Sequence, residues 1–222
     1  SNREQRVRLD LTRPESISEF GVALEGAGLP LHLVINCTGV LHGEGIRPER
    51  SWKQIEHEAM QHLFQVHATG VALVLSEVMN HIPRDQRAVV ASLSARIGSI
   101  EDNRLGGWFS YRASKAAQNM ILKTAAIEAA RRWPELAIVA LHPGTVHSEL
   151  SAPFAKRLPP GRVFEPSQSV EYLRAVISRT RSTDTGTFWA TNACCLLAAS
   201  PRNNHVHSSF FSCLGCPFIK AS

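Results

Sequence analysis

Two side chains in the stretch WFSYRASKAAQNM (108–120), Tyr111 and Lys115, have the types and spacing of an acid–base pair. Four residues make about one helical turn, so both side chains would point from the same face of a helix. A nearby positive charge favours the phenolate and lowers the pKa of a tyrosine, which makes it a proton donor and acceptor near neutral pH. The alternative is a chance pair on a solvated helix face.

The composition describes one globular domain of moderate size, with 222 residues, 44% hydrophobic and 19% charged. The net charge of +5 is spread along the chain, and basic runs such as Arg131–Arg132 are typical of a solvated helix end. We therefore expect no nucleic-acid partner. No apolar run approaches about 18 residues, and no secretion leader is visible, so we expect no membrane span.

The five cysteines form an odd set, with Cys37 alone and the other four close to the C-terminus. An odd count argues against a complete disulfide framework and favours a reducing compartment, so we expect a cytoplasmic protein. The chain begins with Ser1 and not with Met, which is typical of a processed or truncated product. A targeting sequence could have preceded it.

Strand-like and helical patterns alternate along the chain. Strands are predicted at 7–11, 31–37, 88–94, 137–142 and 186–191, and helices from Ser16, over 52–80, over 110–132 and over 167–180. Ser16 has Glu19 three residues later, which is the pattern of a capping box, and 31–37 is an apolar run typical of a strand buried on both faces. This βαβα alternation predicts an α/β fold with a parallel sheet between helices.

Polar and small residues follow several of these strands. Turn 36–39 (NCTG) follows one strand, Ser94 ends another, and turn 143–146 (PGTV) follows a third. Helix 110–132 brings Tyr111 and Lys115 to the same edge. Because ligands bind outside the carboxyl ends of strands in open parallel sheets, the sequence predicts one site there.

In this order and spacing, the motifs resemble those of the short-chain dehydrogenase/reductase family. The stretch LSARIGSIEDNRLGGWFSYRASKAAQNM, together with LHPGTV, is similar to the C-factor-like branch of carbonyl reductases. The resemblance covers a domain at 1–191 and leaves 192–222 as a poorly specified tail. It implies a Rossmann-like doubly wound sheet, NADP or NAD as cofactor, and reduction of a small-molecule carbonyl or oxidation of the alcohol.

The resemblance also implies a role for each site residue. Tyr111 would be the general acid, and Lys115 would lower its pKa and bind the nicotinamide ribose. The remaining assignments are nicotinamide contacts by Pro143, Gly144, Thr145 and Val146, adenine-side ribose and turn contacts by Asn36, Thr38 and Gly39, and an adenine contact by Asp10. Two structural alternatives stay open: Asp10 as the cap of the following turn, and Asn36 as a turn stabiliser.

The chain departs from the family pattern because it lacks the glycine-rich TGxxxGxG turn. The family's first strand, first helix and second strand are therefore missing. In the family's 3-2-1-4-5-6-7 strand order, strand 7–11 would pair with the missing second strand and strand 31–37 with the missing first strand. An open apolar edge would result. A competing hypothesis is a catalytically inactive fragment that binds a partner by this edge or by helix 110–132.

Two catalytic positions also depart from the family. His67 stands where the family usually has a catalytic Asn, and it would be either a proton relay or a helix histidine with a local hydrogen bond. The family's catalytic Ser position falls on Ala95, one residue after Ser94. Ser94 is a candidate, although a shift of one residue on a strand turns a side chain to the other face.

The oligomeric state and a possible metal site are the last two features that the sequence bears on. The resemblance implies a homodimer through helix 110–132 as one outcome and a monomer as another. In the tail, His205, His207, Cys213 and Cys216 are too weakly patterned for a zinc site, and we expect no metal. Neither the substrate nor the choice between NAD and NADP follows from the sequence.

Overall fold

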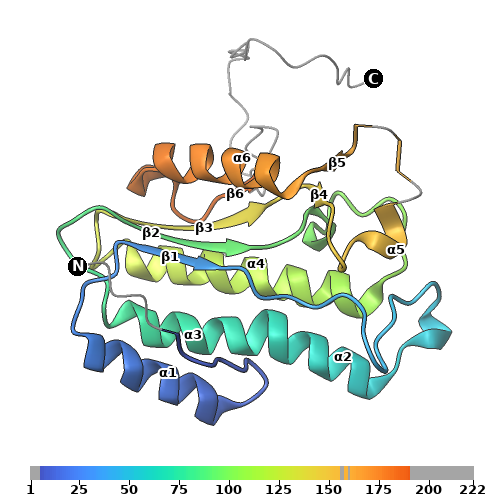
Figure 1. Cartoon of the computed structure of the whole chain (residues 1–222), viewed down its shortest axis with the longest axis horizontal. Coiled ribbons are helices and arrows are strands. Elements are labelled where there is room, and N and C mark those ends of the chain that lie inside the picture. The colour runs from blue at the N-terminus through green and yellow to red at the C-terminus, as the bar shows by residue number, and fades with distance from the viewer. Residues whose placement is uncertain (1–5, 156–157, 160, 191–222) are drawn as a thin grey trace.

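The computed structural model describes residues 6–155, 158–159 and 161–190 of the chain, and it confirms the predicted α/β alternation (Figure 1). The helices are α1 (Pro14–Ala27), α2 (His57–Phe64), α3 (Gly70–Met79), α4 (Phe109–Ala129), α5 (Ala152–Ala155) and α6 (Pro166–Arg179). The strands are β1 (Leu33–Asn36), β2 (Ala88–Leu93), β3 (Leu136–His142), β4 (Thr145–Val146), β5 (Val163–Phe164) and β6 (Phe188–Ala190). The predicted tail lies outside the described residues.

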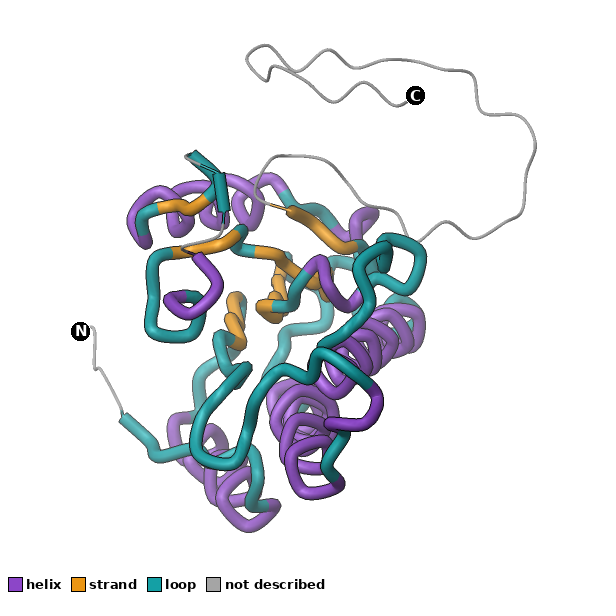
Figure 2. The backbone as a smooth tube through the Cα atoms, turned by 90° about the vertical axis from the view of Figure 1, so that its right-hand side faces the viewer, coloured by secondary structure: helices purple, strands orange, loops and turns teal. Residues whose placement is uncertain are grey.

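The main sheet has four parallel strands in the order β1-β2-β3-β6, and β4 and β5 form a separate parallel pair. Helices α3 and α4 cover one face of the main sheet, with α1 packed against α3, and α6 covers the other face (Figures 1 and 2). The carboxyl ends of all four strands therefore open on one edge, as the Rossmann-like prediction requires.

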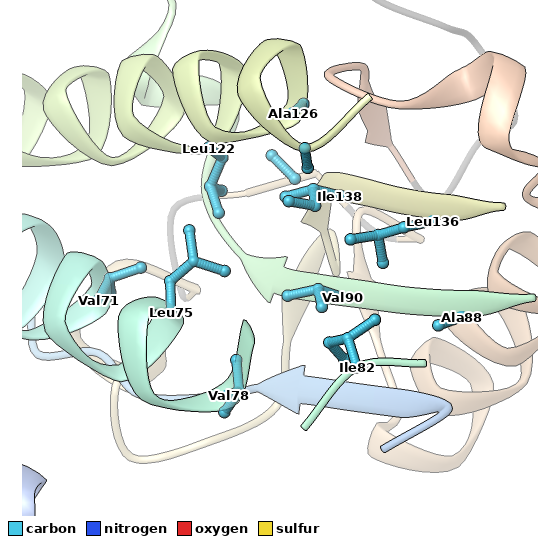
Figure 3. Packing of buried hydrophobic residues seen from close by; sticks show 12 residues of the cluster. Val71, Leu75, Val78, Ile82, Ala88, Val90, Leu122, Ala126, Leu136 and Ile138 are labelled. Carbon is cyan, nitrogen blue, oxygen red and sulfur yellow. The ribbon is translucent and has the colours of Figure 1, made fainter. Parts of the chain in front are cut away.

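The core consists of two layers on either side of β2 and β3. One layer joins the sheet to α3 and α4 and includes Leu75, Val90, Leu122 and Ile138 (Figure 3). Alternate residues of the same strands, such as Val139, face α6. Both faces of β2 and β3 are covered, which explains why these strands are apolar throughout.

Strand β1 differs from the prediction of a strand buried on both faces. Leu33 and Ile35 are 50% and 46% exposed, whereas Val34 packs into the core with α3. Leu33 and Ile35 lie outside the apolar cluster that α6 forms with β2 and β3. β1 is also the edge strand of the described sheet, and no described strand pairs with its outer side.

The predicted strand at 7–11 is wrong, because this segment has no regular structure in the described part. A strand needs a hydrogen-bonding neighbour, and the sequence supplies no second strand for it. The segment packs instead on the start of α3, where a Cβ added to Gly70 would meet the Leu11 Cβ at 2.7 Å. Helix α1 begins at Pro14, before the predicted start at Ser16, and the Ser16 hydroxyl accepts a hydrogen bond from the Asp10 N–H.

The helix predicted over 52–80 is present but interrupted. After a short 3₁₀ turn at Trp52–Gln54, α2 and α3 are joined by a π-helical turn at Gln65–Thr69. A π turn accommodates an extra residue and occurs often at functional sites. His67 lies in the middle of this turn and is buried.

Candidate active site

Tyr111 and Lys115 lie on the first turns of α4, at the carboxyl edge of the sheet. Their side chains are 8% and 3% exposed, and the Lys115 Nζ lies 6.0 Å from the centre of the Tyr111 ring. The alternative of a chance pair on a solvated helix face is therefore wrong. A buried lysine is costly to keep, which makes this lysine beside a buried phenol a candidate site.

The start of α4 is fixed by Glu49, which the sequence analysis did not identify. The buried Glu49 carboxylate accepts hydrogen bonds from the Ser110 hydroxyl and, at 3.3 Å, from the Ser110 N–H. Its backbone oxygen accepts from the Trp108 N–H at 2.6 Å. An acidic side chain at a helix N-terminus compensates unpaired N–H groups. Glu49 and Ser110 are 61 residues apart in the sequence, so no local sequence pattern predicts this contact.

Trp108 precedes α4 in a left-handed conformation with φ of 53°, which a residue with a Cβ rarely adopts. This conformation places the indole against Tyr111, with ring centres 6.2 Å apart, and against Phe154, with ring centres 4.6 Å apart. Leu41 and Ala95 belong to the same apolar cluster. The surroundings of Tyr111 are therefore aromatic and aliphatic.

The two site pKa values shift in ways that the sequence only partly anticipates. Burial raises the pKa of Tyr111 to about 12, so the expected lowering by Lys115 is not found. Burial also lowers the pKa of Lys115 to about 8. Each shift follows from loss of hydration of the charged form. Because this pKa of Tyr111 lies far above neutral, Tyr111 is a protonated phenol at neutral pH.

The Lys115 ammonium lies beside the turn at 36–39. It donates hydrogen bonds to the Leu93 carbonyl oxygen at 3.2 Å and to Gln118 Oε1 at 2.9 Å. A Cβ added to Gly39 would lie 3.7 Å from the Nζ. The structure thus brings Gly39 beside the Lys115 ammonium. The sequence did not predict this contact of Gln118. A polar residue three positions after the lysine, on the same helix face, is the feature that could have indicated it.

Asn36 and Thr38 form a closed turn at the end of β1. Asn36 Oδ1 accepts from the Thr38 N–H at 3.0 Å and from the Thr38 hydroxyl at 2.6 Å, and its Nδ2 donates to Ser92 Oγ at 3.0 Å. This geometry favours the turn-stabilising alternative for Asn36. It also fixes the turn that carries Gly39 to the rim of the site.

His67 is fully buried and uses both ring nitrogens. Its Nε2 lies 3.0 Å from the Val40 N–H, which can only donate, so Nε2 carries no proton. The other nitrogen, Nδ1, lies 2.9 Å from the Ser114 hydroxyl, which in turn donates to the Tyr111 carbonyl oxygen. Burial lowers the pKa of His67 to about 3. These contacts favour the structural alternative over a proton relay.

Ser94 is not brought to Tyr111. Its hydroxyl donates to Asn119 Oδ1 at 2.6 Å, whereas the next residue, Ala95, packs in the cluster around Tyr111. Neighbouring residues of an extended chain point to opposite sides, so only one of the two can face the phenol. In this chain that residue has no hydroxyl.

Asp10 caps the turn that precedes α1. Its carboxylate accepts from the Thr12 N–H at 2.9 Å and from the Thr12 hydroxyl at 2.7 Å, and the hydroxyl contact is the main reason that its pKa is lowered. The structure therefore favours the capping alternative, and the adenine contact stays a prediction.

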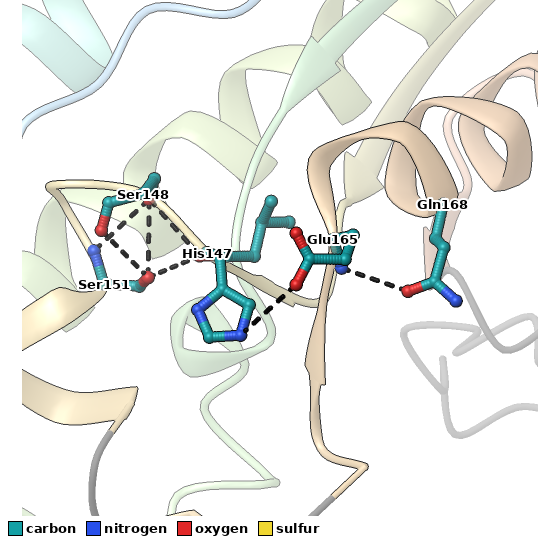
Figure 4. A network of polar contacts seen from close by, with 6 residues as sticks. His147, Ser148, Ser151, Glu165 and Gln168 are labelled. Atoms are coloured by element: carbon teal, nitrogen blue, oxygen red, sulfur yellow. Dashed lines mark hydrogen bonds and ion pairs between the residues drawn. The ribbon is translucent and has the colours of Figure 1, made fainter.

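The turn at 143–146 follows β3 and is tied to the start of α6. Gly144 has φ of 77°, and the Pro143 carbonyl oxygen accepts from Ser169 Oγ at 2.8 Å. Beyond it, Val146 O accepts bonds from Ser148 and Ser151, while His147 Nε2 lies 3.7 Å from Glu165 Oε1 (Figure 4). The predicted nicotinamide-lining residues thus form a fixed turn at the same edge as Tyr111.

The described residues contain no group of His, Cys, Asp and Glu side chains suited to a metal ion. Within the same described ranges, no helix is long and apolar enough to cross a membrane. The four His and Cys residues considered in the tail lie outside the described part.

Comparison with known proteins gives a family match over most of the chain. A family model described as short chain dehydrogenase matches residues 2–158. A 1-hydroxy-2-glutathionyl-2-methyl-3-butene dehydrogenase of Rhodococcus sp. (strain AD45) is 25% identical over 146 residues, which cover 66% of this chain and 60% of the relative. The C-signal protein of Myxococcus xanthus is 31% identical over 101 residues, covering 46% of this chain and 60% of that protein. The chain therefore spans less than two thirds of these curated relatives.

Solved structures show the same fold. An NADPH-bound carbonyl reductase from chicken fatty liver has a TM-score of 0.74 at 23% identity, with 86% of this chain and 75% of that chain covered. The carbonyl reductase Sniffer of D. melanogaster has a TM-score of 0.70 at 18% identity, with 83% and 74% covered.

Proposed function

Because the chain belongs to the short-chain dehydrogenase family, we propose that it is an NAD(P)-dependent oxidoreductase with Tyr111 and Lys115 as its acid–base pair. It would reduce a small-molecule carbonyl or oxidise the corresponding alcohol. The observation that carries this proposal is the burial of both side chains at the carboxyl edge of the sheet, beside Gly39. The carbonyl reductases among the structural neighbours support the reaction type.

The residues present fit one end of a nicotinamide cofactor. Gly39 has no side chain between the turn at 36–39 and the Lys115 ammonium, which leaves that ammonium open to ribose hydroxyls, and the turn at 143–146 lines the same edge. The pyrophosphate end has no matching element, since the sequence contains no glycine-rich turn. When bound, NADP or NAD would supply the hydride.

Tyr111 would donate its phenolic proton to the carbonyl oxygen of the substrate. The raised pKa keeps the phenol protonated at neutral pH. Lys115, still largely charged at neutral pH, would stabilise the phenolate that forms. Ala95, which packs in the cluster around Tyr111, has no hydroxyl, so Tyr111 on α4 would donate the hydrogen bond to the carbonyl oxygen of the substrate.

The walls around Tyr111 favour a carbonyl compound with apolar substituents. Trp108 and Phe154 present ring faces and edges close to the phenol, and Leu41 completes the cluster. A charged substituent placed here would lose its hydration without gaining a partner. Simple dicarbonyls and apolar ketones are therefore the substrates to test first.

The experiment is NADPH oxidation with a simple dicarbonyl by the chain and by Tyr111→Phe, both carrying a family βαβ unit at the N-terminus so that cofactor binding does not limit the rate. The Phe variant keeps the ring packing and removes the proton, so turnover should fall by about a hundredfold or more while cofactor affinity is kept. Equal turnover in both proteins would reject Tyr111 as the acid.

A second candidate function is a catalytically inactive interaction protein, and the open edge of β1 favours it. The exposed Leu33 and Ile35 side chains lie on an edge strand whose outer side pairs with no described strand, which is the geometry that accepts an added strand. Absence of any Tyr111-dependent turnover, together with a partner lost on Leu33→Lys, would establish this alternative.

We also propose a homodimer through α4. A groove of about 520 Å³ runs between α3 and α4 and includes Met79, Met120 and Trp133, and Met120 is largely exposed. A second copy could cover this apolar surface with the same surface of its own. Light scattering on Met120→Glu would test it: a dimer that becomes a monomer supports the proposal, and an unchanged mass rejects it.

A further inference from the structure

Among the described residues, the ammonium of Lys115 is held by neutral oxygens. Its two hydrogen bonds reach the Leu93 carbonyl oxygen and Gln118 Oε1. The titratable groups that face it are the Tyr111 phenol on its own helix and the neutral His67 ring of the π turn, and neither is an anion at neutral pH. A lysine side chain is a flexible stem with a compact head, so its acceptors decide where the head lies.

Gln118 cannot turn its amide without losing contacts. The Leu93 carbonyl can only accept, so the amide nitrogen, 3.1 Å away, must face it. The same nitrogen donates to Ser92 Oγ at 2.8 Å, which leaves Oε1 directed at Lys115. Gln118 is fully buried, where an unpaired amide would be costly.

The network continues to the turn beside the site. Ser92 Oγ also accepts from Asn36 Nδ2, and Asn36 Oδ1 accepts from Thr38. Gln118 therefore joins α4 to the ends of β1 and β2. The position of Lys115 is coupled through it to the turn that carries Gly39.

We propose that Gln118 is the positioning residue of Lys115, holding the ammonium against the end of β2 and beside the turn that carries Gly39. A role of Gln118 in the reaction rests on the oxidoreductase proposal, whereas its hydrogen bond to Lys115 does not. Gln118 touches neither substrate nor cofactor in this account and acts through the lysine alone.

The test is an NMR titration of the Lys115 side chain in the full chain labelled with ¹³C at lysine Cε, with Lys115→Arg identifying the signal. The wild-type midpoint should lie near 8, in keeping with the lowered pKa. Gln118→Glu places a carboxylate at the acceptor position, so the midpoint should rise by about one pH unit or more. Gln118→Leu removes an acceptor that favours the charged form, so it should fall by about half a unit or more.

The matched control is Asn119→Leu, which makes the same amide-to-aliphatic change on the next residue of α4. Asn119 accepts from Ser94 and, within the described residues, makes no hydrogen bond to Lys115, so the midpoint should stay at its wild-type value. A glutamine with a merely structural role would lower stability in both Gln118 variants without moving the titration. That result would overturn the proposal.

Two features keep the outcome decisive. If Gln118→Leu does not fold, Gln118→Glu retains an oxygen at the acceptor position and carries the test alone. The titration needs no turnover. If the chain carrying a family βαβ unit binds NADPH tightly but reduces no carbonyl, the oxidoreductase proposal is rejected, and the NMR shift still decides this inference. Where turnover is measured, Gln118→Glu should move the pH profile in the same direction as the midpoint.

Discussion

Replacement of His67 by Asn should change how the stability of the protein depends on pH. In the folded chain His67 is fully buried with both nitrogens engaged, and its pKa is lowered to about 3. In the unfolded chain a histidine has its ordinary pKa near 6.5. Between these values the unfolded chain binds a proton that the folded chain does not. His67 therefore contributes stability that is present above about pH 6.5 and lost as the pH falls.

The size of the effect follows from this difference. Each pH unit over which one proton is taken up only by the unfolded chain costs about 1.4 kcal/mol. From pH 7 to pH 5 the loss of stability due to His67 is thus about 2 kcal/mol. Asn does not titrate, so this loss should vanish in His67→Asn. At pH 7 the variant should be less stable by about 1–3 kcal/mol, because the Val40 N–H loses its acceptor.

The assay is urea unfolding at pH 7, 6 and 5, followed by circular dichroism. The stability gap between the wild type and His67→Asn should narrow by about 2 kcal/mol towards pH 5. His57→Asn, a change at an exposed histidine of α2, is the control and should run parallel to the wild type. A gap that stays constant with pH would refute the reasoning. Turnover should be kept or raised in His67→Asn, since neither ring nitrogen is available to pass a proton.

Three further predictions concern the charge, the cofactor and the open edge. From pH 7 to pH 9.5 the free energy of unfolding of the wild type should rise by about 2 kcal/mol relative to that of Lys115→Met, because burial lowers the pKa of Lys115. Urea unfolding at both pH values measures this rise, and a difference between the two proteins that does not change with pH would contradict it. In fluorescence titrations, residues 1–222 should bind NADPH about a hundredfold or more weaker than the same chain carrying a family βαβ unit, and equal affinity would be the contrary result. Leu33→Lys should lower self-association in light scattering, whereas Leu29→Lys, also exposed, should not.

Much of the fold follows from local patterns in the sequence. The buried strands β2 and β3 and the helices α4 and α6 are predicted correctly because each is a long apolar or amphipathic run with clear ends. The strand predicted at 7–11 fails because no described strand lies beside this segment, and a strand depends on its neighbour more than on its own residues. The exposure of Leu33 and Ile35 likewise depends on which elements cover β1, which the residues of β1 do not encode.

The sequence indicates which residues are candidates for the site, but not which contacts hold them in place. Lys115 lies beside both Tyr111 and Gly39, because the carboxyl ends of parallel strands share one edge. The contacts of Glu49 and Gln118 join residues distant in sequence or depend on which atom of an amide faces which neighbour. No periodicity encodes these details. The pKa of Tyr111 also follows burial and not the nearby lysine, which spacing alone cannot weigh.

The measurement that tests the central claim most directly is the steady-state rate of NADPH oxidation with a simple dicarbonyl, compared between Tyr111 and Tyr111→Phe. Both proteins should carry a family βαβ unit at the N-terminus, so that cofactor binding does not limit the rate, and the cofactor Kd of each should be measured beside it. The account predicts a kcat lower by about a hundredfold or more in the Phe variant, with the Kd nearly unchanged. Equal kcat values, or no turnover in either protein despite tight NADPH binding, would contradict it.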